Sequence, residues 1–298
     1  MYRKFFTGVL FLAIFMVFSV TAVPAKAQTI PTPAERAALI AQINFLLETI
    51  QLLQAQLEAR TEKTPYTYRS NDNYVIIDTF YYGKDFEAIY EIDRDLNLIR
   101  RDKTTAPREL DEKLWEMFVD TVGDQAARRY ITEFRVFNNK ESSLGGFIEL
   151  PAGEDKWIVG FNRDDFKPGN DLSRQIYTVL MLHEYAHLQT FYMKDFVENF
   201  ADRFWTTADK RHAKKITELS GAEIDQKLQN YYQNHQNDFV SDYATYSFDE
   251  DVAETFVDFI LEDKPTSDYR KKDAKILYMY KNRELLELRS ELRRNLGL

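Results

Sequence analysis

Residues 179–193 read VLMLHEYAHLQTFYM and set two histidines, His183 and His187, four positions apart in an otherwise apolar run. Apolar residues precede them at helical intervals, at Leu172, Ile176, Val179 and Leu180. Asn170-Asp171 can cap this helix, and Pro168-Gly169 keeps it from starting earlier. The pattern predicts a long helix whose buried face carries both imidazoles.

His183, Glu184 and His187 fit the pattern H-E-x-x-H, the helix motif that holds zinc in metalloproteases. Four residues of α-helix rise about 6 Å and turn slightly past one revolution, so both imidazoles point the same way and can share one ion. Glu184 would lie at an adjacent edge, near enough to act on a water at the metal. The alternative, two ordinary core histidines, would bury both rings and a carboxylate without partners, at a cost of several kcal/mol. A metal site explains all three residues.

A catalytic zinc ion keeps three protein ligands and one open position, so a third ligand must lie elsewhere in the chain. The metzincin motif requires a glycine three residues and a histidine six residues after His187, where this chain has Thr190 and Met193. His235 is a weaker candidate, because its polar, Asn/Gln-rich surroundings favour a loop. We therefore expect a carboxylate ligand on a downstream helix.

Three carboxylates recur at four-residue intervals within residues 242–259, DYATYSFDEDVAETFVDF: Glu250, Glu254 and Asp258. Charge at this spacing is often only a solvated helix face. Apolar residues lie between them and favour instead a packed helix over 250–262: Val252, Ala253, Phe256 and Val257. A packed helix could bring either Glu250 or Glu254 against the histidines.

Composition limits the partners of the chain. Its formal charge of −9 and pI near 5.2 offer the phosphates of a nucleic acid no general attraction. The basic run from Arg270 to Arg294 is interleaved with glutamate and leucine, which indicates a solvated amphipathic helix. The chain has no cysteine, which excludes disulfides, thiol catalysis and thiolate metal sites. We expect no nucleic-acid partner, and a metal held by histidines and carboxylates.

The N-terminal segment indicates export. Residues 1–27 combine a basic start, an apolar run from Phe5 to Val23 and an A-x-A cleavage site, so they form a signal peptide or, uncleaved, a signal-anchor in the membrane. Residues 28–63 predict a helical stalk, because apolar residues in 34–60 follow coiled-coil spacing that would allow weak self-association. The remaining chain would be secreted or anchored on the outer face of the cytoplasmic membrane.

Residues 64–298 mix strands with helices. Short segments rich in β-branched and aromatic residues predict strands, at 74–82, 86–92, 96–101, 130–138 and 156–162. Helical spacing is seen over 110–123, and residues 195–238 are largely helical in character but polar. We predict one α+β domain with a small antiparallel sheet and an active-site helix that carries the two histidines.

His183-Glu184-x-x-His187, followed by Tyr243 and by Glu250-Asp251-x-Ala253-Glu254, resembles the gluzincin metallopeptidases, most closely the group that contains the anthrax lethal factor catalytic domain and related secreted bacterial endopeptidases. The resemblance implies a zincin-like fold in which Glu250 is the third zinc ligand, Tyr243 stabilises the transition state and Glu254 supports a ligating histidine. The thermolysin-like variant of the pattern would instead put the ligand at Glu254 and the supporting carboxylate at Asp258. The first register is favoured, because only in it does a tyrosine, Tyr243, precede the ligand by the expected seven residues.

The expected function is therefore that of an exported Zn²⁺-dependent endopeptidase acting on a peptide or protein, with Glu184 as general base and Tyr243 sharing the developing oxyanion. Zincins commonly hold their substrate as an added strand at a sheet edge. Residues 145–150 or 157–162 are the candidates for that edge, unless both are ordinary buried strands. Two alternatives are a cell-envelope scaffold whose zincin body has lost turnover, and a hydrolase of a non-peptide amide.

Overall fold

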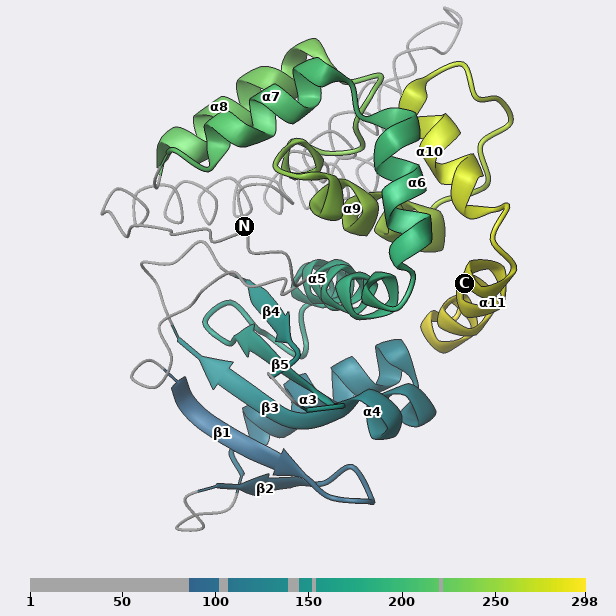
Figure 1. Ribbon diagram of the computed structural model, residues 1–298. Helices are drawn as coiled ribbons and strands as arrows, with labels where there is room; N and C mark the ends of the chain where they lie inside the picture. Colours follow the sequence, from purple (N-terminus) through teal and green to yellow (C-terminus); the bar gives the residue numbers. More distant parts are fainter. Residues whose placement is uncertain (1–85, 102–106, 139–144, 152–153, 220–221) are drawn as a thin grey trace, which may run out of the picture.

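The computed structural model describes residues 86–101, 107–138, 145–151, 154–219 and 222–298 (Figure 1). The expected signal segment 1–27, stalk 28–63 and strand 74–82 lie outside these residues. Within the described ranges, no helix combines the length and the apolar character that crossing a membrane would require. The described chain is α+β, with helices and one small sheet.

Within the described residues, the sheet has five strands in the order β2-β1-β3-β5-β4. Their bounds are Phe86–Ile92 for β1, Leu98–Arg100 for β2, Ile131–Phe137 for β3, Gly146–Glu149 for β4 and Trp157–Asn162 for β5. Three pairs are antiparallel, but β3 and β5 are parallel. The sheet is therefore mixed, and the prediction of an antiparallel sheet is wrong. The chain leaves β3, forms β4 at the far edge and returns as β5 between them, which gives β5 the direction of β3.

The position of β5 inside the sheet decides which strand is free to pair. All six residues of Trp157–Asn162 are buried, as expected for a strand covered on both faces. Residues 157–162 are therefore not an edge, which corrects one of the two candidates for substrate pairing. Strand β4, within the other candidate segment 145–150, lies at the edge of the sheet formed by the described residues.

Glycines and phenylalanines alternate between β4 and β5 at their contact. Gly146 lies opposite Phe161, and Phe147 lies opposite Gly160. A Cβ atom at either glycine would overlap the opposing ring, so each ring packs directly onto the backbone of the neighbouring strand. This close approach fixes the register of the edge strand.

Two helices pack beside each other against one face of the sheet. Helix α3 (Glu109–Val122) places Trp115 against Phe134 and Phe118 against Phe161. Its neighbour α5 (Asp171–Phe191) contacts α3 and β4, and the Tyr177 hydroxyl at its start donates to the Asn162 carbonyl at the end of β5. These contacts fix α5 relative to the sheet.

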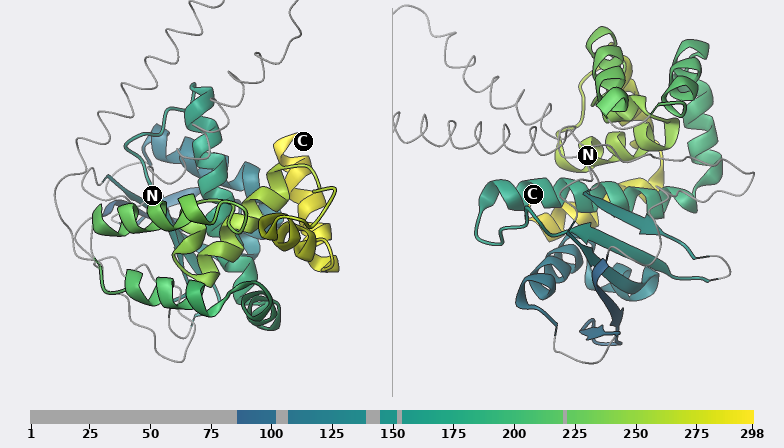
Figure 2. Two further views of the ribbon diagram at one scale, coloured as in Figure 1. Left: turned by 90° about the horizontal axis from the view of Figure 1, so that it is seen from above. Right: turned by 90° about the vertical axis from the view of Figure 1, so that its left-hand side faces the viewer.

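Helix α5 separates the sheet from a second, helical half of the molecule (Figure 1, Figure 2). The remaining helical elements are α4 (Asp124–Tyr130), α6 (Lys194–Phe204), α7 (Thr207–Ile216), α8 (Ala222–Asn234), the 3-10 turn η1 (Tyr243–Thr245), α9 (Phe248–Leu261), α10 (Lys271–Met279) and α11 (Arg283–Leu296). The basic C-terminal run forms two helices rather than one, because Asn282 caps a new helix at Arg283. Helix α9 packs along α5, which brings the two predicted motifs together.

Candidate metal centre

The two histidines lie in the buried middle of α5. The helix begins where Asn170 accepts a hydrogen bond from the Ser173 backbone amide at 2.9 Å, as its sequence predicts. His183 and His187 are 1% and 3% exposed, and their Nε2 atoms are 3.1 Å apart. One turn of helix therefore aims both ring nitrogens at the same point.

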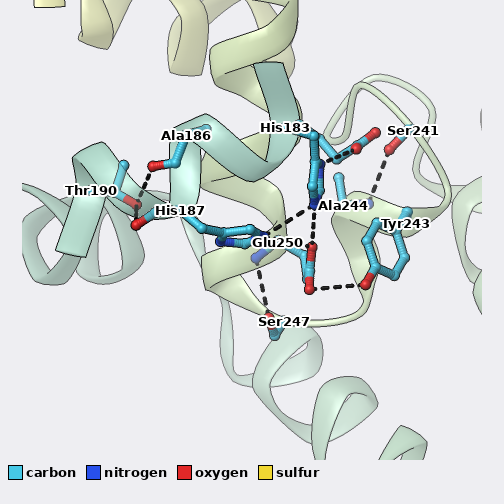
Figure 3. A network of polar contacts seen from close by, with 10 residues as sticks. His183, Ala186, His187, Thr190, Ser241, Tyr243, Ala244, Ser247 and Glu250 are labelled. Atoms are coloured by element: carbon cyan, nitrogen blue, oxygen red, sulfur yellow. Dashed lines mark hydrogen bonds and ion pairs between the residues drawn. The ribbon is translucent and has the colours of Figure 1, made fainter. Parts of the chain in front are cut away.

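Glu250 reaches that point from α9. Its helix starts at Ser247, whose hydroxyl accepts a hydrogen bond from the Glu250 backbone amide at 3.2 Å. The Glu250 Oε2 atom lies 3.1 Å from His183 Nε2 and 3.4 Å from His187 Nε2. Figure 3 shows the carboxylate between the two imidazoles and the Tyr243 ring. The structure thus assembles a buried His183-His187-Glu250 group that could hold a metal ion.

The spacing of these three atoms fits a tetrahedral metal. Ligands about 2.0–2.1 Å from a zinc ion at tetrahedral angles are about 3.3–3.4 Å from one another. The three distances here are 3.1, 3.1 and 3.4 Å. Two histidine nitrogens and one carboxylate oxygen also suit zinc, since no softer thiolate is present in the chain. The residues present therefore fit the ion that the sequence leads us to expect.

Glu254 lies one helical turn after Glu250 and contacts the opposite side of the His183 ring. Its Oε1 atom is 2.7 Å from His183 Nδ1. Such a contact orients an imidazole and fixes which nitrogen carries the proton. Asp258, another turn along α9, is outside the metal-holding group. Glu250 thus belongs to the group that could hold a metal ion, and Glu254 contacts the other nitrogen of His183.

Tyr243 lies in the 3-10 turn η1, directly before α9. Its hydroxyl donates a hydrogen bond to Glu250 Oε1 at 2.9 Å, and its ring centroid is 5.6 Å from that of His183. The turn is held by Thr245, whose hydroxyl donates to the Asp242 carbonyl, and by Ser241, which accepts from the Ala244 amide. Tyr243 therefore presents its hydroxyl at the rim of the metal-holding group.

The protonation states of the histidines and carboxylates in this group depend on one another. Burial disfavours the charged form of His183, but Glu250 and Glu254 outweigh it and raise its pKa well above the ordinary value. Burial alone would raise the pKa of Glu250, yet His187 and His183 hold it well below the ordinary range. Burial raises the pKa of Asp249 to about 6 and that of Asp258 to about 7. Without metal, the group therefore favours a protonated His183 beside an ionised Glu250.

Glu184 and His235, the other two candidate residues from the sequence, lie in different surroundings. Glu184 is buried on α5, 3% exposed, next to His183. His235 is outside the group, because it stacks on the Tyr231 ring with centroids 4.0 Å apart. Ser247 is a residue that sequence reasoning missed. The segment Ser247-x-x-Glu250 matches the start of a capped helix, and this pattern could have located the beginning of α9.

No family model, curated protein or solved structure compared with this chain matches it.

Proposed function

We propose that this chain is a zinc-dependent metallopeptidase of gluzincin type. The observation that carries the proposal is the convergence of His183, His187 and Glu250 at tetrahedral spacing, with Glu184 in the sequence position of a general base. The contact of Glu254 with His183 and the position of Tyr243 add two further parts of the same machinery. The resemblance to the gluzincins, including a zincin-like fold, belongs to this proposal.

A zinc ion bound by these residues would make a water acidic enough to lose its proton near neutral pH and would polarise the substrate carbonyl. Glu184 would accept that proton and return it to the leaving amine. The Tyr243 hydroxyl, which donates to Glu250 in this structure, would turn its hydrogen bond to the oxyanion that develops on the carbonyl. Glu254 would hold the His183 ring and its proton in place.

An extended peptide is the substrate that the sheet suits. Strand β4 lies at one edge of the sheet that the described residues form, and it contacts the same helix α5 that carries the histidines. A peptide added alongside β4 would gain backbone hydrogen bonds and run past the metal-holding group. We therefore propose peptide bonds, rather than other amides, as the scissile groups.

Substitution of Glu184 by glutamine tests this function. The full-length chain, supplied with zinc, is incubated with a diverse peptide library, and cleavage is read by mass spectrometry. Glu184→Gln should retain zinc and lose cleavage by at least about 100-fold, the low end of the usual contribution of a general base. A chain that binds zinc but cuts no peptide, and that Glu184→Gln leaves unchanged, would favour the scaffold alternative. Cleavage confined to non-peptide amides would favour the other alternative, a hydrolase of non-peptide amides.

A further inference from the structure

A buried lysine packs against α9 from a helix that carries none of the metal-holding residues. Lys275 belongs to α10, which packs against α9 and α6 (Figure 1). Its side chain is 0% exposed. A fully buried ammonium group is rare unless its charge is compensated, so its partners show what it does.

Lys275 joins three parts of the chain. Its Nζ atom is 2.7 Å from Asp251 Oδ2 on α9 and donates a hydrogen bond to the Asp238 carbonyl at 2.6 Å. It also lies 3.9 Å from the centroid of the Phe239 ring. Asp251, itself 0% exposed, accepts a second hydrogen bond at 2.7 Å from the Trp205 indole nitrogen, at the end of α6. The ammonium and the carboxylate thus contact each other, and each has a further hydrogen-bond partner.

The network touches the two segments that carry the metal-centre residues. Asp251 directly follows Glu250 in the first turn of α9, and Glu254 lies one turn beyond it. Asp238 and Phe239 precede η1, the turn that carries Tyr243. Anchoring Asp251 and the Asp238 carbonyl to one nitrogen ties the start of α9 to the segment that leads into η1, and so bears on the offset between Glu250 and Tyr243.

We infer that Lys275 and Asp251 are positioning residues that preorganise the metal centre: their buried ion pair, with Trp205 as a third member, sets where Glu250, Glu254 and Tyr243 lie relative to the two histidines. This inference rests on the metal site of the proposed function. Neither residue contacts the metal-holding atoms, so their effect passes through the backbone of α9 and of residues 238–243. Zinc affinity should therefore depend on a lysine that is not a ligand.

The test replaces both charges at once, because removing one partner alone leaves the other charge buried and unpaired. Lys275→Met with Asp251→Asn keeps the approximate volumes and leaves an amide oxygen to accept from Trp205. The matched control is Arg163→Met with Asp111→Asn. Asp111 is also 0% exposed, pairs with Arg163 at 2.5 Å and accepts from the Tyr90 hydroxyl at 2.6 Å, but it joins α3 to the segment after β5.

Zinc affinity is measured for full-length parent and both double variants by competition with a chromophoric chelator, at a temperature where circular dichroism shows each to be folded. The Lys275/Asp251 variant should bind zinc about tenfold or more weakly, a loss typical of residues that orient ligands, and the control should stay within about twofold of the parent. Equal affinity in the two variants, both folded, would overturn the inference while the zinc site stands. A parent that binds no zinc would overturn the proposed site itself.

A milder variant decides the case in which Lys275→Met/Asp251→Asn does not fold. Trp205→Phe removes the hydrogen bond to Asp251 and part of the buried indole, but keeps a ring against Phe239, whose centroid is 5.9 Å away. Its zinc dissociation constant should rise by about threefold or more, as expected for partial loss of an orienting contact. Unchanged affinity in folded Trp205→Phe would overturn the inference.

Discussion

Glu254 Oε1 lies 2.7 Å from His183 Nδ1, while the other nitrogen of the same ring lies 3.1 Å from Glu250. One imidazole therefore connects two carboxylates that are one turn apart on α9. The arrangement requires His183 to present Nε2 to the metal-holding group and Nδ1 to Glu254. Helix α9 thus supplies both an oxygen of the group that could hold a metal ion and the carboxylate that contacts another member of that group.

Glu254→Gln should weaken zinc binding by about 10- to 100-fold, because the neutral amide holds the His183 proton less strongly and lowers the basicity of the ring. Glu262→Gln is the control, since it makes the same change of charge at an exposed position on the C-terminal side of α9. Zinc affinity is measured by chelator competition. Equal affinities for the two variants would exclude an orienting role for Glu254.

Glu250→Ala should lower zinc occupancy far more than Asp258→Ala. Of these two residues, Glu250 places an oxygen within reach of both Nε2 atoms, at 3.1 and 3.4 Å, whereas Asp258 lies outside the group. Metal content of the purified variants is measured by mass spectrometry after dialysis against a defined free zinc concentration. The reverse order would mean that the thermolysin-like register, with Glu254 as ligand and Asp258 behind it, is the correct one.

Tyr243→Phe should lower kcat by about 100- to 1000-fold with little change in KM, because the hydroxyl would act on the oxyanion only in the transition state. Zinc content should not change. Tyr246→Phe is the control, since its ring lies 5.8 Å from that of Tyr243 at the end of the same turn. Steady-state kinetics on a cleaved peptide would contradict the assignment if both variants behaved alike, or if only KM rose.

The histidine pair could be predicted because its geometry is local. Four residues of helix place His183 above His187 whatever the rest of the fold does, and the capping residue Asn170 is adjacent in sequence. The same holds for the spacing of Glu250 and Glu254 on α9. What local spacing left open was which glutamate meets the histidines, because that depends on how α9 lies along α5.

The sheet shows where local reasoning fails. Strands β3 and β5 were both predicted. Their parallel pairing arises because β4, which lies between them in the sequence, takes the outer position in the sheet. Nothing in the alternation of either strand encodes that choice. The Lys275-Asp251 pair is a similar case, since a lysine in a helix near the C-terminus is ordinarily solvated and only the packing of α10 on α9 buries it.

Zinc affinity and stability should respond to pH in opposite directions. In the metal-free chain the raised pKa of His183 means that the folded protein holds this proton more tightly than the unfolded chain. Its contribution to the free energy of unfolding is therefore full below the ordinary histidine pKa of about 6.5 and is lost as the pH rises through the folded pKa. Metal-free protein should become less stable as the pH rises above about 6.5, because the unfolded chain then gives up this proton while the folded chain still holds it.

Zinc must displace the same proton, so its dissociation constant should fall as the pH rises over this window, and binding near pH 7 should release about one proton from His183. Calorimetry in buffers of different ionisation enthalpy measures the released protons, and thermal unfolding with and without chelator measures stability. Glu254→Gln removes one of the carboxylates that raise the His183 pKa, so it should reduce both the proton release and the loss of metal-free stability. Stability of the metal-free protein that increased with pH in this range would show that His183 is neutral there.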